Sequence, residues 1–158
     1  MSSQLKVNDT VVSSKFGIGI IVEFEYIEGF GGECLSIQVH NKNAKVLIPN
    51  RESHKLRKVA TPNELHDSIK RLSSNITVRD FESKKDRINF FKEHSEDQSL
   101  NESIDMIKEL NTLDDRGSAE SKILQTLIDS LANEMVFVLE SEFDHAKETI
   151  LNALGGNK

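Results

Sequence analysis

The sequence of 158 residues predicts an α+β protein, in which a small, partly open five-stranded β barrel precedes an all-helical module. Two observations carry this prediction. Up to about residue 60, short β-branched runs alternate with turns that contain glycine, the pattern of short antiparallel strands. Beyond that point the apolar residues recur three and four positions apart, which is the spacing of amphipathic helices.

The five expected strands are short and are joined by tight turns. They cover residues 9–12, 17–24, 33–40, 44–49 and 55–59. Two glycines in the second strand indicate a bend or a close backbone approach, and a glycine-rich hairpin leads to the third strand. Alternation in the third strand places Leu35 and Ile37 on one face, and Cys34 and Ser36 on the other.

The helical spacing of apolar residues begins after residue 60. Thr61 can cap a helix, Pro62 takes the first helical position and Glu64 completes a capping box. We expect this helix to end at a joint over residues 73–75. Four more helices are expected over residues 79–93, 100–113, 118–140 and 142–154. Their apolar stripes are typical of the core of a helical bundle.

The joint divides the chain into a β domain of residues 1–72 and a helical domain of residues 76–158. The net charge of −6 is distributed unevenly between the two ends. Residues 1–92 carry 15 basic and 11 acidic side chains, whereas residues 93–158 carry 5 basic and 15 acidic ones. The acidic part would repel nucleic-acid phosphates, so a DNA contact has to be local and to precede Lys92.

Several classes of function find no support in the sequence. The chain has neither a membrane-spanning run nor the pattern of a signal peptide, so we expect a cytoplasmic protein. Cys34 stands alone and is expected to be a buried thiol, and five scattered histidines do not suggest a metal site. We therefore expect no enzyme, no cofactor and no small-molecule substrate, and a chain that acts as a monomer.

Four segments occur in a characteristic order and spacing. They are NDTVV at residues 8–12, GIGII at 17–21, LIP at 47–49 and LRKVAT at 56–61. In this order they resemble the CarD/CdnL family of bacterial RNA polymerase-binding transcription regulators, which shares its N-terminal module with the transcription-repair coupling factor. A helical C-terminal half that ends in AKETIL at residues 146–151 extends the resemblance over essentially the whole chain.

The resemblance implies a Tudor-like β module that binds the lobe of the RNA polymerase β subunit. Binding in the family adds a strand of the partner to an exposed sheet edge, whose backbone groups are unpaired. The implied contact positions are Glu25, Ile37, Leu47 and Pro49. Some family members carry arginine where this chain has Glu25, so the charge is reversed. The residues themselves leave open that Leu47 is an ordinary exposed apolar side chain.

The helical module departs further from the family. DNA-binding members carry a tryptophan beside basic residues, but the aligned stretch here is RDFESKKDRINFFKE and the chain has no tryptophan. Phe81 is the nearest aromatic residue, and Arg79, Lys84, Lys85 and Arg87 could contact phosphates. The interleaved acidic residues cancel most of this charge, so a solvated helix face is an equal alternative. Any contact with promoter DNA is expected to be weak and to require tethering to polymerase.

Together these patterns predict a non-enzymatic transcription regulator. Its β module would bind RNA polymerase, and the protein would modulate the formation or stability of the promoter open complex. Two alternatives remain open at this point. In the first, the acidic helical module of a polymerase-docked adaptor binds another protein instead of DNA. In the second, the chain is an interaction module without any polymerase contact.

Overall fold

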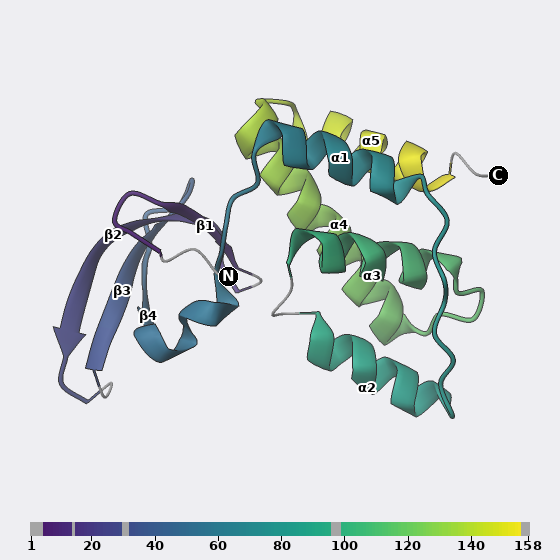
Figure 1. The fold of residues 1–158 in the computed structure, drawn as a ribbon, viewed down its shortest axis with the longest axis horizontal. Coiled ribbons are helices and arrows are strands. Elements are labelled where there is room, and N and C mark those ends of the chain that lie inside the picture. The colour runs from purple at the N-terminus through teal and green to yellow at the C-terminus, as the bar shows by residue number, and fades with distance from the viewer. Residues whose placement is uncertain (1–4, 14, 30–31, 96–98, 156–158) are drawn as a thin grey trace. The chain divides into compact units, whose positions relative to one another are not determined.

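The computed structural model of the chain describes residues 5–13, 15–29, 32–95 and 99–155. The chain forms two compact units, Met1–Val59 and Ala60–Lys158. The first unit contains a five-stranded antiparallel sheet, and the second is built from α-helices (Figure 1). This arrangement confirms the α+β class predicted from the change of period near residue 60.

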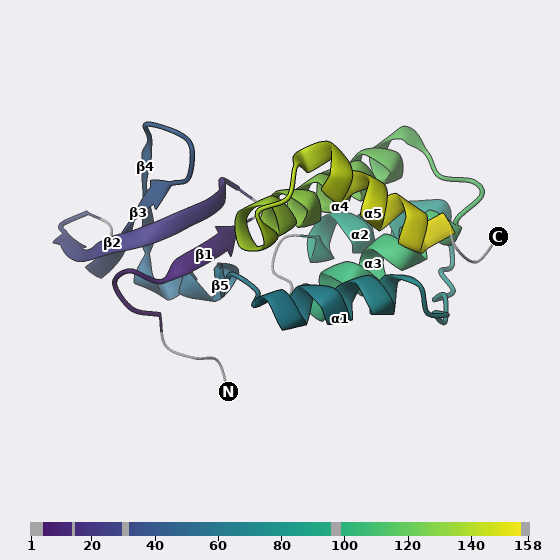
Figure 2. The same ribbon diagram turned by 90° about the horizontal axis from the view of Figure 1, so that it is seen from above.

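The sheet is open, with strands β4 and β5 at its two edges. Its strands are β1 (Thr10–Ser13), β2 (Gly17–Ile27), β3 (Gly32–Val39), β4 (Lys45–Pro49) and β5 (Arg57–Lys58). They lie in the order β4-β3-β2-β1-β5 (Figure 2). The short 3-10 helix η1 (Asn50–Lys55), which the sequence did not predict, leads from β4 to β5.

A β-bulge in β2 decides which face of the sheet each side chain takes. The register between β2 and β3 shifts between Ile21 and Glu23. Ile21 and Phe24 therefore both pack on the core face, although simple alternation would separate them. Glu23 and Glu25 lie on the opposite face for the same reason. The buried core of this unit consists of Val11, Ile21, Leu35, Ile37 and Leu56.

The helical unit has five α-helices within the described residues. They are α1 (Pro62–Leu72), α2 (Lys84–His94), α3 (Leu100–Thr112), α4 (Ser118–Leu139) and α5 (Phe143–Gly155). The predicted capping box of α1 is present: Thr61 Oγ1 accepts the Glu64 N–H, and the Glu64 carboxylate accepts the Thr61 N–H. Helix α2 begins at Lys84 and not at residue 79, because Ser83 caps it.

Helix α1 belongs to the helical unit. It lies beside α3 and α5 (Figures 1 and 2), and its Leu65 and Leu72 are buried in the helical core. The buried carboxylate of Glu134 in α4 also accepts the Ala60 N–H at 2.8 Å. The division between the compact units therefore falls between Val59 and Ala60. This differs from the predicted division into residues 1–72 and 76–158, because Leu65 and Leu72 of α1 belong to the core of the helical unit.

The apolar stripes predicted for the third and fourth helices form most of the helical core. Ile104, Ile107 and Leu110 of α3 are fully buried, and α3 packs against α4. Leu127 and Leu131 of α4 belong to the same cluster. Among the described residues, no helix is both long enough and apolar enough to span a membrane.

Gly19 lies where β2 passes β3 with no space for a side chain. A Cβ atom at this position would lie 2.5 Å from Cγ2 of Ile37 and 3.0 Å from the carbonyl oxygen of Gln38. Because Ile37 is buried in the core and Gln38 contributes backbone, neither can move away at low cost. The close approach accounts for the glycine noted in the sequence.

We predict that Gly19→Ala lowers the free energy of unfolding of the sheet by about 1–3 kcal/mol, the usual cost of overpacking. Urea unfolding of the full chain, followed at sheet amides by NMR, measures this change. Gly117→Ala is the control, because a Cβ atom there meets open space. Equal midpoints for the wild type and Gly19→Ala would contradict the prediction.

Candidate functional site

Strand β4 has an edge that no other described strand pairs. Its partner is β3, and the Val39 N–H donates to the Ala44 carbonyl at 3.0 Å. In an antiparallel ladder, alternate residues turn their backbone groups toward the partner strand. The residues between them, Lys45, Leu47 and Pro49, therefore direct theirs to the free edge. Pro49 lacks an N–H, and at this outward position no bond to β3 is lost.

The register aligns side chains in rows across β2, β3 and β4 on the face opposite the core cluster, although Cys34 and Ser36 within these rows are fully buried. One row consists of Glu23, Ser36 and Leu47, and the next consists of Glu25, Cys34 and Pro49. Directly opposed residues share a face of the sheet. Three of the four predicted polymerase contacts, Glu25, Leu47 and Pro49, therefore lie together. Leu47 is 36% exposed, and Glu25 and Pro49 are half-buried.

Ile37, the fourth predicted contact, lies in the core of the unit. Its side chain is 0% exposed and packs in the cluster that includes Ile21 and Leu35. It neighbours Ser36 in β3, so the pleat turns it to the other face. We therefore correct this assignment: Ile37 supports the sheet from inside and offers no exposed surface for a contact.

Glu23 is a member of this face that the sequence analysis did not identify. It is exposed, and neither Glu23 nor Glu25 forms an ion pair with a described residue. Simple alternation would place both glutamates on the same face as Ile21, in the core. Only the shift of register after Ile21 turns them outward. The signal in the sequence is the charge itself, since two carboxylates are not buried without partners.

The predicted DNA-binding residues that precede α2 pack against the helical unit itself. The ring centroid of Phe81 lies 5.4 Å from that of Phe90 and 6.0 Å from that of Phe91. The guanidinium of Arg79 lies over the Phe90 ring at 4.2 Å and donates to Glu109 at 3.3 Å. The Glu109 side chain is 2% exposed. Phe81 and Arg79 therefore attach this segment to α2 and α3.

Arg87 forms the most buried ion pair of the predicted patch. Its Nε and Nη2 donate to the two carboxylate oxygens of Glu120 at 2.6 and 2.8 Å, and Nη1 donates to Asp115 at 3.0 Å. The side chains of Arg87 and Glu120 are 12% and 1% exposed. These hydrogen bonds hold the pKa of Glu120 below its ordinary value. Glu120 also accepts the Gly117 N–H, so the same carboxylate caps α4.

Both candidate lysines are exposed. Lys84 Nζ lies 3.4 Å from Asp115 in an exposed ion pair. Lys85 is exposed and has no ion pair within the described part of the chain. Charge pairing therefore leaves little net positive charge on this surface, as the solvated-face alternative requires.

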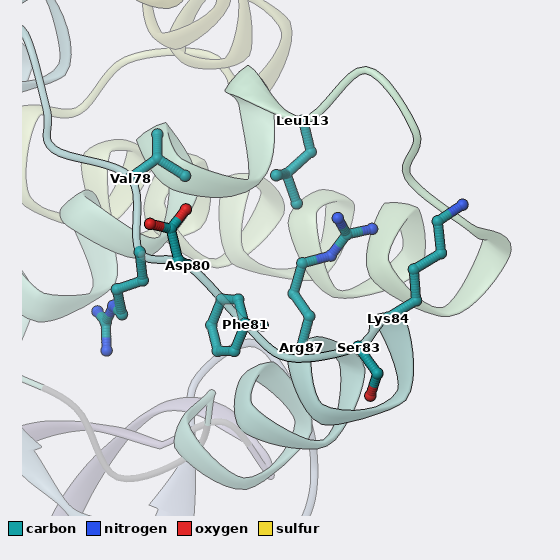
Figure 3. A pocket seen from close by; sticks show the side chains of 8 residues that line it. Val78, Asp80, Phe81, Ser83, Lys84, Arg87 and Leu113 are labelled. Atoms are coloured by element: carbon teal, nitrogen blue, oxygen red, sulfur yellow. The ribbon is translucent and has the colours of Figure 1, made fainter.

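A pocket of about 350 Å³ brings four of the candidates together. It is lined by Val78, Arg79, Asp80, Phe81, Ser83, Lys84, Arg87 and Leu113. Figure 3 shows the guanidinium of Arg87 directed into this pocket toward Leu113, whereas Lys84 points away from it. The cations at this pocket are already paired with Glu109, Glu120 and Asp115. No group of side chains suited to a metal ion occurs among the described residues.

Residues 5–60 match the family model of the CarD-like/TRCF RID domain. The match covers β1 to β5 and ends where α1 begins, at the division between the two compact units. The N-terminal unit is therefore a CarD-like RNA polymerase-interacting domain, and the free edge of β4 lies inside it. A search of curated proteins found no match to the chain.

We predict that Arg87→Met destabilises the helical unit by about 3 kcal/mol or more, because it leaves Glu120 buried without its partner. Lys85→Met is the matched control: it removes the same charge from α2 at an exposed position and should change stability by less than about 0.5 kcal/mol. Chemical denaturation of both variants, followed by far-ultraviolet circular dichroism, measures the difference. Equal stability of the two variants would show that the Arg87 ion pair contributes nothing net.

Proposed function

We propose that this protein is a transcription regulator that docks on the β subunit of RNA polymerase through the free edge of β4. The observation that carries the proposal is the position of that edge within the matched domain. Leu47 and Pro49 lie beside outward-directed backbone groups, in a unit whose sequence matches an RNA polymerase-interacting domain. The partner site proposed is the lobe of the β subunit.

Strand addition suits this edge for two physical reasons. The Lys45 and Leu47 backbone groups need hydrogen-bond partners, and an added strand supplies them without rearranging the sheet. The Leu47 side chain is exposed in the free chain, so covering it would remove apolar surface from water. Backbone pairing would give affinity, and the side chains of the face would select the partner.

The helical unit would then act near the promoter because polymerase holds it there. Tethering raises the effective concentration of a weak binding module, so contacts too weak to act alone become useful. Lys84 and Lys85 are exposed and could reach phosphates, whereas Arg79, although 51% exposed, is paired with Glu109. We propose that the protein modulates open-complex formation or stability in the cytoplasm, as a non-enzymatic monomer.

A second candidate is a polymerase-docked adaptor whose helical unit binds another protein. The observation that favours it is the neutralisation of Arg79 and Arg87 by Glu109 and Glu120, which removes two of the cations expected to contact DNA. Residues 93–158 also carry 15 acidic side chains against 5 basic ones, which disfavours phosphates and suits a basic protein surface.

We predict that Leu47→Arg weakens binding to RNA polymerase about tenfold or more, because Leu47 is the exposed apolar side chain of the docking edge. Binding of the full chain to core polymerase of the source organism, measured by biolayer interferometry, tests this. Val7→Arg is the matched control, since Val7 is also exposed, at 44%, and precedes β1 rather than β4. Its affinity should equal that of the wild type.

Two further variants at the same position separate the backbone from the side chain. Leu47→Pro removes the outward N–H as well as the leucine, whereas Leu47→Ala removes the side chain alone, so the proline variant should bind more weakly. Neither should disturb the pairing with β3, which does not use this N–H. A large fall in melting temperature for Leu47→Arg would instead place Leu47 in the core.

We predict that the isolated protein binds duplex DNA only as ordinary nonspecific binders do, with a dissociation constant of roughly 10⁻⁴ M or weaker at physiological salt. A DNA role should appear only on polymerase and should depend on Lys84, Lys85 and Phe81. Open-complex lifetimes with the wild type, the double variant Lys84→Glu/Lys85→Glu and Phe81→Ala test this. If the wild type changes the open-complex lifetime and the variants change it equally, the adaptor function gains support.

A further inference from the structure

Two carboxylates without ion-pair partners lie on the face that adjoins the docking edge. Glu23 belongs to the row of Leu47, and Glu25 belongs to the row of Pro49. Neither glutamate is paired with a cation among the described residues, although the surface ion pairs Lys55–Glu52 and Lys58–Asp9 occur in the same unit. The face therefore carries negative charge that the described chain leaves uncompensated.

A buried hydroxyl lies between these carboxylates and the edge. Ser36 is fully buried, and its Oγ has no hydrogen-bond partner among the described residues. Ser36 lies between Glu23 and Leu47 in the same row. Unpartnered buried hydroxyls are rare because they give up hydrogen bonds to water without replacement. The hydroxyl and the glutamates mark one polar site beside the apolar edge.

We propose that the segment of the partner that docks at β4 presents a basic side chain, which crosses the sheet face to Glu23 and Glu25. The inference rests on the proposed function, since it concerns the same edge. An added strand would lie three strand spacings, roughly 14 Å, from β2. Only long side chains meet across that distance. Arginine fits best, because its planar guanidinium can donate to both carboxylates, and to the Ser36 hydroxyl once the side chains that bury this hydroxyl in the free chain move aside.

The charge on this face distinguishes an arginine-bearing partner from other partners. A wholly apolar segment would cover the two carboxylates without compensating their charge, which disfavours binding. An acidic segment would add repulsion between like charges. A basic segment instead replaces the water around Glu23 and Glu25 with charge-assisted hydrogen bonds.

The test compares binding of full-chain variants to core RNA polymerase of the source organism, at low and at high salt. The double variant Glu23→Gln/Glu25→Gln should lose about tenfold or more in affinity at low salt, and its affinity should depend less on salt. Glu33→Gln is the matched control, since Glu33 is exposed in β3 and neighbours Cys34, so it turns to the other face. It should bind like the wild type.

Ser36→Ala examines the buried hydroxyl separately. It should weaken binding without lowering the melting temperature, because the hydroxyl has no partner to lose in the free chain. If the wild type binds and the double variant binds equally well at both salt concentrations, the inference is overturned while docking at β4 stands. If the wild type does not bind polymerase, the proposed function and this inference fall together.

Discussion

The antiparallel register of β3 with β2 and β4 is the constraint on which the first unit depends. It places Leu35 and Ile37 in the core, and by the same alternation it places Cys34 and Ser36 on the opposite face. A change of register by one residue would exchange the two sets. The core and the face that carries Glu23, Glu25 and Leu47 are therefore two consequences of one pairing. The bulge after Ile21 turns Glu23 and Glu25 to the same face of the sheet as Ser36 and Cys34.

In the helical unit, charged residues join segments that are distant in sequence. Arg87 of α2 binds Glu120 of α4, and Arg79 binds Glu109 of α3. Helix α2 buries Phe91 alone, so these ion pairs and the aromatic contacts of Phe81 supply much of its attachment. The residues that resembled a DNA-binding patch thus have a structural role. Arg87 is 12% exposed and is held by a buried carboxylate, whereas Arg79 is 51% exposed but is already paired with Glu109.

The division of the chain into two compact units agrees with the extent of the family match. The RNA polymerase-interacting domain ends at residue 60, and the next residues already belong to the helical core, where Glu134 holds the Ala60 backbone. The family match is confined to the β unit, whereas the excess of acidic side chains lies in residues 93–158. Binding by the edge of a sheet makes few demands on side chains, so the domain can change its partner contacts while its core remains the same.

The sequence by itself determined the α+β class, the five strands, the capped start of α1 and the apolar stripes of α3 and α4. These features follow from local periodicity and from capping residues, which act within a few positions of the chain. Only the tertiary structure decided that α1 joins the helical unit, that Ile37 is core, that Glu23 faces outward and that Arg87 is buried beside Glu120. Each of these depends on which distant segment lies opposite, and the pattern of residues around a position does not specify that partner.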